Sequence, residues 1–114
     1  MLQAINWAVQ QCEVDIITIS IALSEVNEDI DEALDQALDP EYKHATAKII
    51  FAAAGNKGCN KPLAWPASKN GVIAIHATDW HGTPANINPG TDESEVSFAT
   101  LGQAAADPGK GTIE

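Results

Sequence analysis

The chain has 114 residues, of which 45% are hydrophobic, and a formal net charge of −10 at pH 7. This length fits one domain with a globular interior. Its basic residues are six lysines, against sixteen acidic residues, so the composition argues against nucleic acid and anionic membrane surfaces as partners. No apolar run approaches the ~20 residues that a membrane-spanning helix needs.

The first elements expected are a helix over residues 2–12 and a strand over residues 14–21. The apolar side of this helix is interrupted by glutamines and Asn6, which is not typical of a signal peptide. Cys12 precedes the strand, whereas Cys59 follows the carboxyl end of a parallel neighbour, about 20 Å away. That distance is too long for a disulfide. The two unpaired thiols, together with an N-terminal segment that does not resemble a signal peptide, favour a cytoplasmic location.

Residues 27–38 predict an amphipathic helix, because apolar residues recur at helical spacing from Ile30 to Leu38. Asn27 is the expected N-cap. Many of the acidic residues lie on the polar side of this helix, and we expect them to form its solvent-exposed face. Their spacing lacks the pattern of a calcium-binding loop, so the sequence predicts no metal site, and nothing in it indicates a cofactor.

The rest of the chain predicts strands at 48–54, 72–78 and 95–100. Pro40 is expected to interrupt the connection to the first of them, with a second short helical piece near 41–47. The apolar run that ends at Gly55 is typical of a strand covered on both faces. The order of elements predicts an α/β fold with a parallel sheet and flanking helices, in which residues 79–95 form a surface loop.

The turn after strand 48–54 reads Gly55-Asn56-Lys57-Gly58. Gly55 permits a sharp bend, and the carboxyl end of a strand is where ligand sites collect in open α/β sheets. Taken alone, such a sequence is typical of a simple turn. Its meaning therefore depends on the remainder of the chain.

Four pieces of the chain, in the same order, resemble the subtilisin-like serine proteases (the subtilase family). They are residues 4–8 with 14–20, the Ala-Ala-Ala-Gly-Asn-Lys-Gly segment at 52–58, the Trp-Pro-Ala-Ser turn at 65–68 with the strand at 72–79, and residues 96–102. The resemblance implies that residues 1–102 are a partial subtilase-like catalytic domain and residues 103–114 a tail. It also implies a serine endopeptidase activity, with peptides or proteins as substrates.

Residue by residue, the resemblance gives Asn56 the role of the oxyanion-hole donor. An amide suits this role because it stabilises negative charge without changing its protonation state. The resemblance also implies a set of substrate-binding residues: Ser20, Ile21 and Ala22 on the groove strand, Ala53, Ala54 and Gly55 on the opposite wall of the specificity pocket, and Ala64 near its floor.

The family's Asp, His and Gly-Thr-Ser-Met-Ala motifs are not found in this chain. The nucleophilic serine is therefore expected to lie outside it, and the chain alone is expected to be inactive. His81-Gly82-Thr83 copies the start of the family's His motif but comes after the oxyanion strand, whereas the family has the order Asp, His, Ser. His81 is therefore not expected to be catalytic.

Two other functions stay open. The family usually has glycine where this chain has Ala22 and Leu23, and side chains there are expected to narrow the groove, which favours a non-catalytic subtilase-like binding module. An unrelated doubly wound domain that binds a small ligand is the other alternative, although the chain has no Gly-x-Gly-x-x-Gly or phosphate-loop motif. A sheet this small is also expected to leave unpaired edges that promote association.

Overall fold

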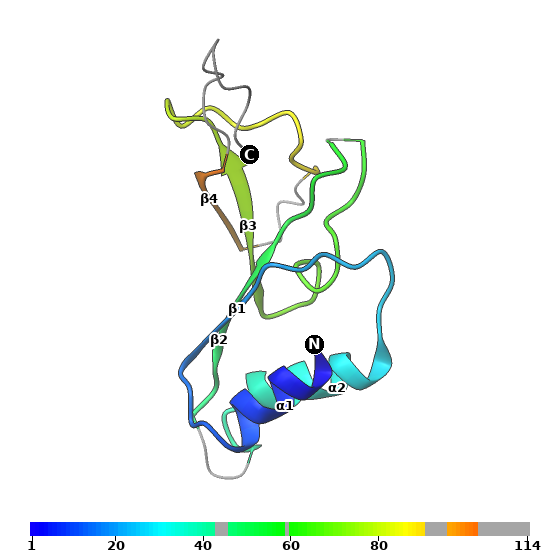
Figure 1. Cartoon of the computed structure of the whole chain (residues 1–114), viewed down its shortest axis with the longest axis vertical. Coiled ribbons are helices and arrows are strands. Elements are labelled where there is room, and N and C mark those ends of the chain that lie inside the picture. Colours follow the sequence, from blue (N-terminus) through cyan, green and yellow to red (C-terminus); the bar gives the residue numbers. More distant parts are fainter. Residues whose placement is uncertain (43–45, 59, 91–95, 103–114) are drawn as a thin grey trace.

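The computed structural model describes residues 1–42, 46–58, 60–90 and 96–102. Its elements are, in chain order, α1 (Leu2–Gln10), β1 (Ile16–Ile19), α2 (Glu28–Leu38), β2 (Ile49–Ala53), β3 (Val72–Thr78) and β4 (Ser97–Leu101). The four strands form one sheet in the order β1-β2-β3-β4, and every neighbouring pair is parallel. Figure 1 shows α1 and α2 side by side next to this sheet. The predicted α/β class with a parallel sheet is confirmed.

The core lies between the two helices and one face of the sheet. Along β1 and β2 the side chains alternate, so that Ile17, Ile19, Ile50 and Ala52 are buried while their neighbours are not. This is the two-residue period of a strand with one face covered. In the sheet Ile17 pairs with Ile50 and Ile19 with Ala52, which brings the buried residues of both strands onto the helix side.

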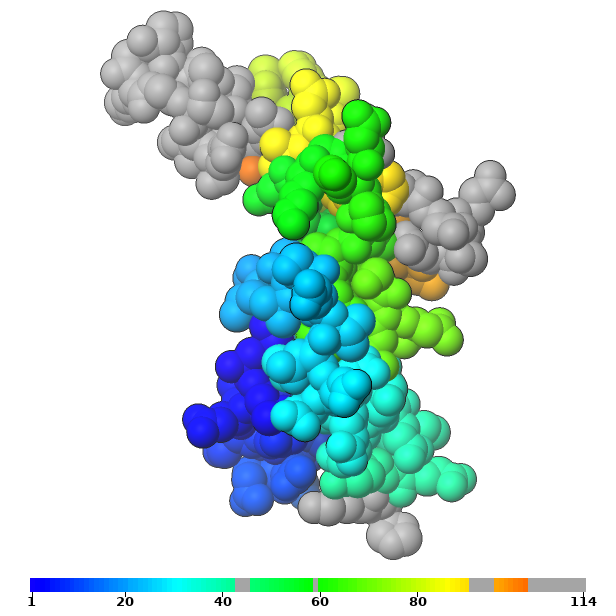
Figure 2. Space-filling model, turned by 90° about the vertical axis from the view of Figure 1, so that its right-hand side faces the viewer, coloured from blue at the N-terminus to red at the C-terminus, as the bar shows by residue number. Residues whose placement is uncertain are grey.

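Helix α2 begins as its sequence predicts. The side chain of Asn27 accepts a hydrogen bond from the backbone N–H of Ile30 at 3.1 Å, which satisfies one of the free amides of the first turn. The residues of its inner stripe are buried, namely Ile30, Ala33, Leu34 and Ala37. Its acidic side faces solvent, and α2 lies at the surface in Figure 2, in cyan.

One lysine ties α2 to the turn that precedes β3. The Nζ of Lys69 lies 2.7 Å from Oδ1 of both Asp31 and Asp35. Burial lowers the pKa of Lys69, but the hydrogen bonds and negative charges of the two aspartates raise it by more, so the pKa stands above its ordinary value. The lysine is therefore held in its charged form beside the helix.

Several predicted boundaries were wrong. The first helix ends at Gln10 rather than at residue 12, and the strand expected over 14–21 is limited to Ile16–Ile19. Residues 46–48 are not helical, contrary to the helix expected near 41–47, because the backbone N–H of Lys48 donates to the carbonyl of Ala37 at 2.8 Å and leads the chain straight into β2. Residues 43–45, 59, 91–95 and 103–114 lie outside the described residues, and with them part of this predicted helix, Cys59 and the tail.

The second face of the sheet lies on the side away from the helices and is apolar. Ile16 and Ile49, which pair across β1 and β2, are 56% and 49% exposed, and Phe98 on β4 is 59% exposed. Strands β1 and β4 are the edges of the sheet within the described part of the chain. No helix in the described ranges is both long and apolar enough to cross a membrane.

Candidate functional site

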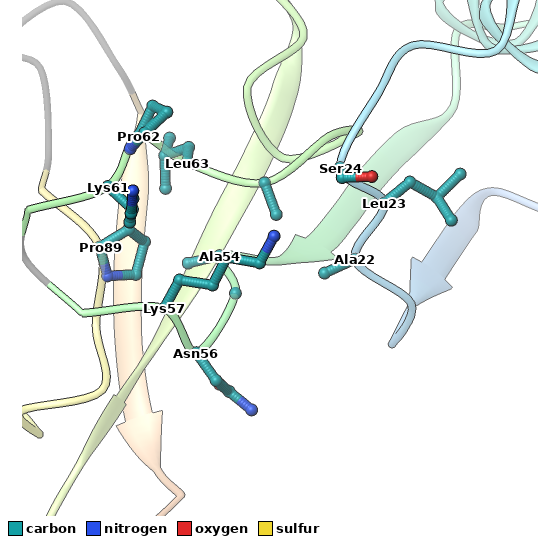
Figure 3. Close-up of a pocket in the computed structure, with 12 residues that line it drawn as sticks. Ala22, Leu23, Ser24, Ala54, Asn56, Lys57, Lys61, Pro62, Leu63 and Pro89 are labelled. Carbon is teal, nitrogen blue, oxygen red and sulfur yellow. The ribbon is translucent and has the colours of Figure 1, made fainter.

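A pocket of about 170 Å³ opens where the segment after β1 faces the segment after β2. Its walls come from separate parts of the chain, whose side chains are drawn in Figure 3. The lining residues are Ala22, Leu23 and Ser24 after β1; Ala54, Gly55, Asn56 and Lys57 after β2; and Lys61, Pro62, Leu63, Ala64 and Pro89. The pocket thus lies at the carboxyl ends of parallel strands, the usual position of ligand sites in α/β sheets.

The wall formed by β2 depends on a close approach of two backbone segments. Ala54 donates its N–H to the carbonyl of Ile75 at 3.0 Å, and its own carbonyl accepts the N–H of Ala64 at 2.9 Å. Gly55 follows with φ of +103°, and a Cβ placed there would lie 3.0 Å from the Cβ of Ala64. Glycine is required at this position both by its backbone angle and by its neighbour.

The opposite wall is held by a reciprocal backbone pair. Leu23 donates its N–H to the carbonyl of Trp65 at 2.8 Å and accepts the N–H of Trp65 at 3.2 Å. Trp65 is buried in the core. Leu23 is therefore fixed in an isolated antiparallel bridge with Trp65, although it lies beyond the end of β1.

Asn56 is exposed at the mouth of the pocket. In Figure 3 its side chain points away from Lys57 and from the pocket interior. Asn56 also lines a second hollow of about 250 Å³, with His76, Asn88 and Thr100 among its other lining residues. Asn56 therefore lies between two hollows and lines both of them.

The loop that contains Asn88 is bonded to β3 through the Asn88 side chain. The Asn88 side chain accepts the N–H of Ala77 at 2.9 Å and donates to the carbonyl of the same residue at 2.7 Å. Gly58 in turn donates its N–H to Ile87 at 3.0 Å, and Gly90 donates to Lys61 at 3.2 Å. These bonds hold the positions of Asn56 and of the two lysines relative to the sheet.

Five of the eight residues singled out from the sequence lie together in the pocket: Ala22, Ala54, Gly55, Asn56 and Ala64. Ser20 and Ala53 instead line a hollow with Thr18 and Phe51, and Ile21 is exposed. Ala53 and Ala54 differ because neighbouring residues of an extended segment face opposite sides. Sequence reasoning missed Lys57 and Lys61 as lining residues, although Lys57 directly follows Asn56.

The electrostatic character of the pocket differs from that of the whole chain. Lys57 and Lys61 line it, and no aspartate or glutamate in the described part of the chain does. Within the described residues neither lysine forms an ion pair, whereas Lys69 forms two. The same part of the chain contains no group of three His, Cys, Asp or Glu residues arranged to hold a metal ion. The pocket therefore carries positive charge in a chain of net charge −10.

His81 lies elsewhere, in an exposed turn after β3. The Asp79 carboxylate accepts the N–H groups of His81 and Thr83 at 2.8 and 2.9 Å. The imidazole lies against the ring of Trp80, with 3.9 Å between ring centroids. His81 is not among the pocket residues. The turn that Asp79 stabilises explains why the His81-Gly82-Thr83 sequence occurs here.

Solved structures of proteases share this fold. The chain superposes on the prenylagaramide maturation protease PagA with a TM-score of 0.70 and 27% identity, covering 98% of this chain and 40% of that one. For the S218A mutant of the protease domain of PatA the TM-score is 0.72 with 28% identity, over 99% of this chain and 41% of that one. For the subtilisin-like protease Apa1 from Pseudoalteromonas sp. AS-11 the TM-score is 0.69 with 25% identity, over 90% of this chain and 22% of that one.

Comparison of sequences also finds similarity to proteases. The minor extracellular protease Epr of Bacillus subtilis (strain 168) is 28% identical over 97 residues, which are 85% of this chain and 14% of that protein. The chain thus spans only a small part of this relative. The model of the subtilase family matches residues 1–108. The chain therefore belongs to the subtilase family.

Proposed function

We propose that this chain supplies the oxyanion hole and part of the substrate groove of a serine endopeptidase whose nucleophile lies outside residues 1–114. The observation that supports this most is the place of Asn56. Its exposed side chain follows strand β2 and lies at the mouth of a pocket built by the subtilase-like segments. Hydrogen-bond donors fixed where negative charge develops are the largest single contribution in many acyl-transfer enzymes.

In the proposed reaction a general base takes the proton of a serine hydroxyl as its oxygen attacks the carbonyl carbon of the scissile peptide. The carbonyl π electrons move onto oxygen, and the side-chain N–H of Asn56 donates to the resulting oxyanion. When the tetrahedral intermediate collapses, the C–N bond breaks and the amine leaves with the proton that the base, now a general acid, returns. Water then attacks the remaining serine ester, which releases the carboxylic acid and restores the serine hydroxyl. Asn56 stabilises the intermediate without gaining or losing a proton itself.

The pocket is proposed to receive the substrate side chain that precedes the scissile bond. Ala22 and Leu23 form one wall, and Ala54 and Gly55 form the other, with Ala64 between them. The segment Ser20–Ala22 is proposed to pair with the substrate backbone, because the N–H and carbonyl of Leu23 are bonded to Trp65. A volume of about 170 Å³ lies below the ~300–1,000 Å³ of typical small-ligand sites, which supports a single side chain as its occupant.

The test is peptide hydrolysis by the natural protein that contains this chain, together with labelling by a fluorophosphonate probe. Hydrolysis and stoichiometric labelling at a serine beyond residue 114 are the expected results. The 114-residue polypeptide serves as the control and is expected to give neither. A natural protein that cleaves no peptide and takes up no probe would overturn the proposal.

A second function is favoured by one observation. Ala22 lines the pocket at a position where the family usually has glycine, and in Figure 3 its Cβ points toward Ala54, whereas the Leu23 side chain packs against the core. A non-catalytic module that binds extended peptides is consistent with this narrowing. Retained peptide binding in a natural protein that takes up no fluorophosphonate would favour this second function over hydrolysis.

A further inference from the structure

We infer that the pocket selects a substrate side chain that bears a carboxylate, glutamate in the first place. This inference rests on the proposed function, because it names the side chain that the proposed specificity pocket would take. The observation behind it is the juxtaposition of Lys57 and Lys61 at a pocket that no acidic residue of the described ranges lines.

The distribution of lysines makes this juxtaposition specific. Four of the six lysines lie within the described residues. Lys48 is buried, and Lys69 is held by Asp31 and Asp35. The other two both line the same pocket, in a chain with sixteen acidic residues. Every described lysine that is exposed and outside an ion pair is therefore placed at this one site.

The two lysines reach the pocket from different sides. In Figure 3 the Lys57 side chain extends past Ala54 toward the segment of Ala22 and Ser24, so its amine lies within the ring of lining residues. Lys61 lies beside Pro89, and its carbonyl accepts the N–H of Gly90 at 3.2 Å. Each ammonium group offers three hydrogen-bond donors.

The remaining lining matches the rest of a glutamate side chain. Ala22, Ala54, Leu63 and Ala64 present methyl and methylene groups, against which the two methylenes of glutamate can pack. Its carboxylate would then lie near the ammonium of Lys57, and a hydrogen bond between charged partners is stronger than one between neutral groups. Arginine and lysine side chains would instead meet like charges, which disfavours them.

The direct test measures binding, so that it does not depend on hydrolysis. Two peptide amides that differ only in a terminal Glu or Gln are titrated against the natural protein by calorimetry. Glutamine matches glutamate in shape but lacks the charge. We expect the Glu peptide to bind about tenfold more tightly, within the range of charge-assisted hydrogen bonds, and the ratio to fall as ionic strength rises.

Three variants assign the effect to Lys57. Lys57→Gln is expected to lower the Glu-to-Gln ratio to about twofold, with Lys61 as the remaining cation, and Lys57→Arg is expected to restore most of it because the charge returns. Lys69→Gln changes the net charge equally but lies in the ion pairs with α2, so the ratio is expected to be unchanged. Equal binding of both peptides, binding of neither, or an equal loss in Lys69→Gln would overturn the inference.

Cleavage assays separate this inference from the proposed function. Hydrolysis that shows no preference for Glu over Gln would overturn the selectivity and leave the endopeptidase function standing. Selective binding of the Glu peptide by a protein that hydrolyses nothing would support the selectivity and overturn the proposed hydrolysis.

Discussion

Gly55 and Ala64 approach so closely that a Cβ on Gly55 would lie 3.0 Å from the Cβ of Ala64. Gly55 also has φ of +103°, a backbone conformation that costs other residues about 1–2 kcal/mol. We therefore expect Gly55→Ala to lower the free energy of unfolding by about 2–3 kcal/mol, the sum of backbone strain and a forced shift of the pocket wall. Urea denaturation of both proteins measures this loss.

The matched control is Gly82→Ala. Gly82 has a similar φ of +83°, but a Cβ there would meet no atom within 4 Å. Only the backbone strain of about 1–2 kcal/mol is expected. If both variants lost the same stability, the contact between Gly55 and Ala64 would not constrain the pocket.

The cap of α2 gives a second prediction. Asn27→Ala removes the side-chain acceptor for the N–H of Ile30 and is expected to lower the free energy of unfolding by about 1 kcal/mol. Asn27→Asp keeps an acceptor at the same position and should retain most of the stability. A stability of Asn27→Ala equal to that of the wild type in chemical denaturation would show that this cap is not needed.

The ion pairs of Lys69 give a third prediction. Lys69→Met removes the charge that faces Asp31 and Asp35. Because Asp35 is largely exposed and solvent screens the pair, the expected loss is about 1 kcal/mol or less. Lys61→Met, which removes a lysine outside these ion pairs, serves as the control in the same denaturation experiment.

The pH dependence of this loss follows from the direction of the pKa shift. The pKa of Lys69 is raised above its ordinary 10.5 in the folded protein. Its stabilising contribution is therefore fully present below pH 10.5 and is lost as the pH rises through the folded-state pKa. The difference between wild type and Lys69→Met should stay constant at neutral pH and shrink above 10.5. A difference that instead shrank on acidification from neutral pH toward about pH 6 would contradict this assignment.

The apolar face of the sheet gives a fourth prediction. In the 114-residue polypeptide we expect self-association through this face and the edge strands, and Phe98→Lys should weaken it in sedimentation velocity. Trp7→Lys is the matched control, because Trp7 is also 59% exposed but lies on α1. Equal effects of the two substitutions would indicate association through general hydrophobicity rather than through the sheet.

Much of the fold could be predicted from local pattern. The stripe from Ile30 to Leu38 and the cap at Asn27 predicted α2, and strand β3 matched its predicted range of 72–78. The helical piece expected near 41–47 was wrong at residues 46 and 47, because the chain there leads to Lys48, which forms a tertiary hydrogen bond with Ala37. Local propensity does not include such contacts.

The site was harder to predict in detail. The motif around Asn56 located the carboxyl end of β2, and family resemblance gave Ala22, Ala54 and Ala64 as its neighbours. Lys61 and Pro89 could not be found in this way, because they reach the pocket through a loop whose path depends on hydrogen bonds such as that from Gly90 to Lys61. Ala54 lines the pocket and Ala53 does not, because side chains of neighbouring residues in an extended segment point to opposite sides.

The kinetics of Asn56→Ala in the natural protein test the proposed role of this chain most directly. Asn60→Ala is the control, because Asn60 is an exposed asparagine that does not line the pocket. We predict that Asn56→Ala lowers kcat by about 10²–10³ with little change in KM, a magnitude measured for such an asparagine in subtilisin itself. Asn60→Ala should match the wild type. A kcat of Asn56→Ala within about twofold of the wild type would contradict the assignment of Asn56 as the oxyanion donor.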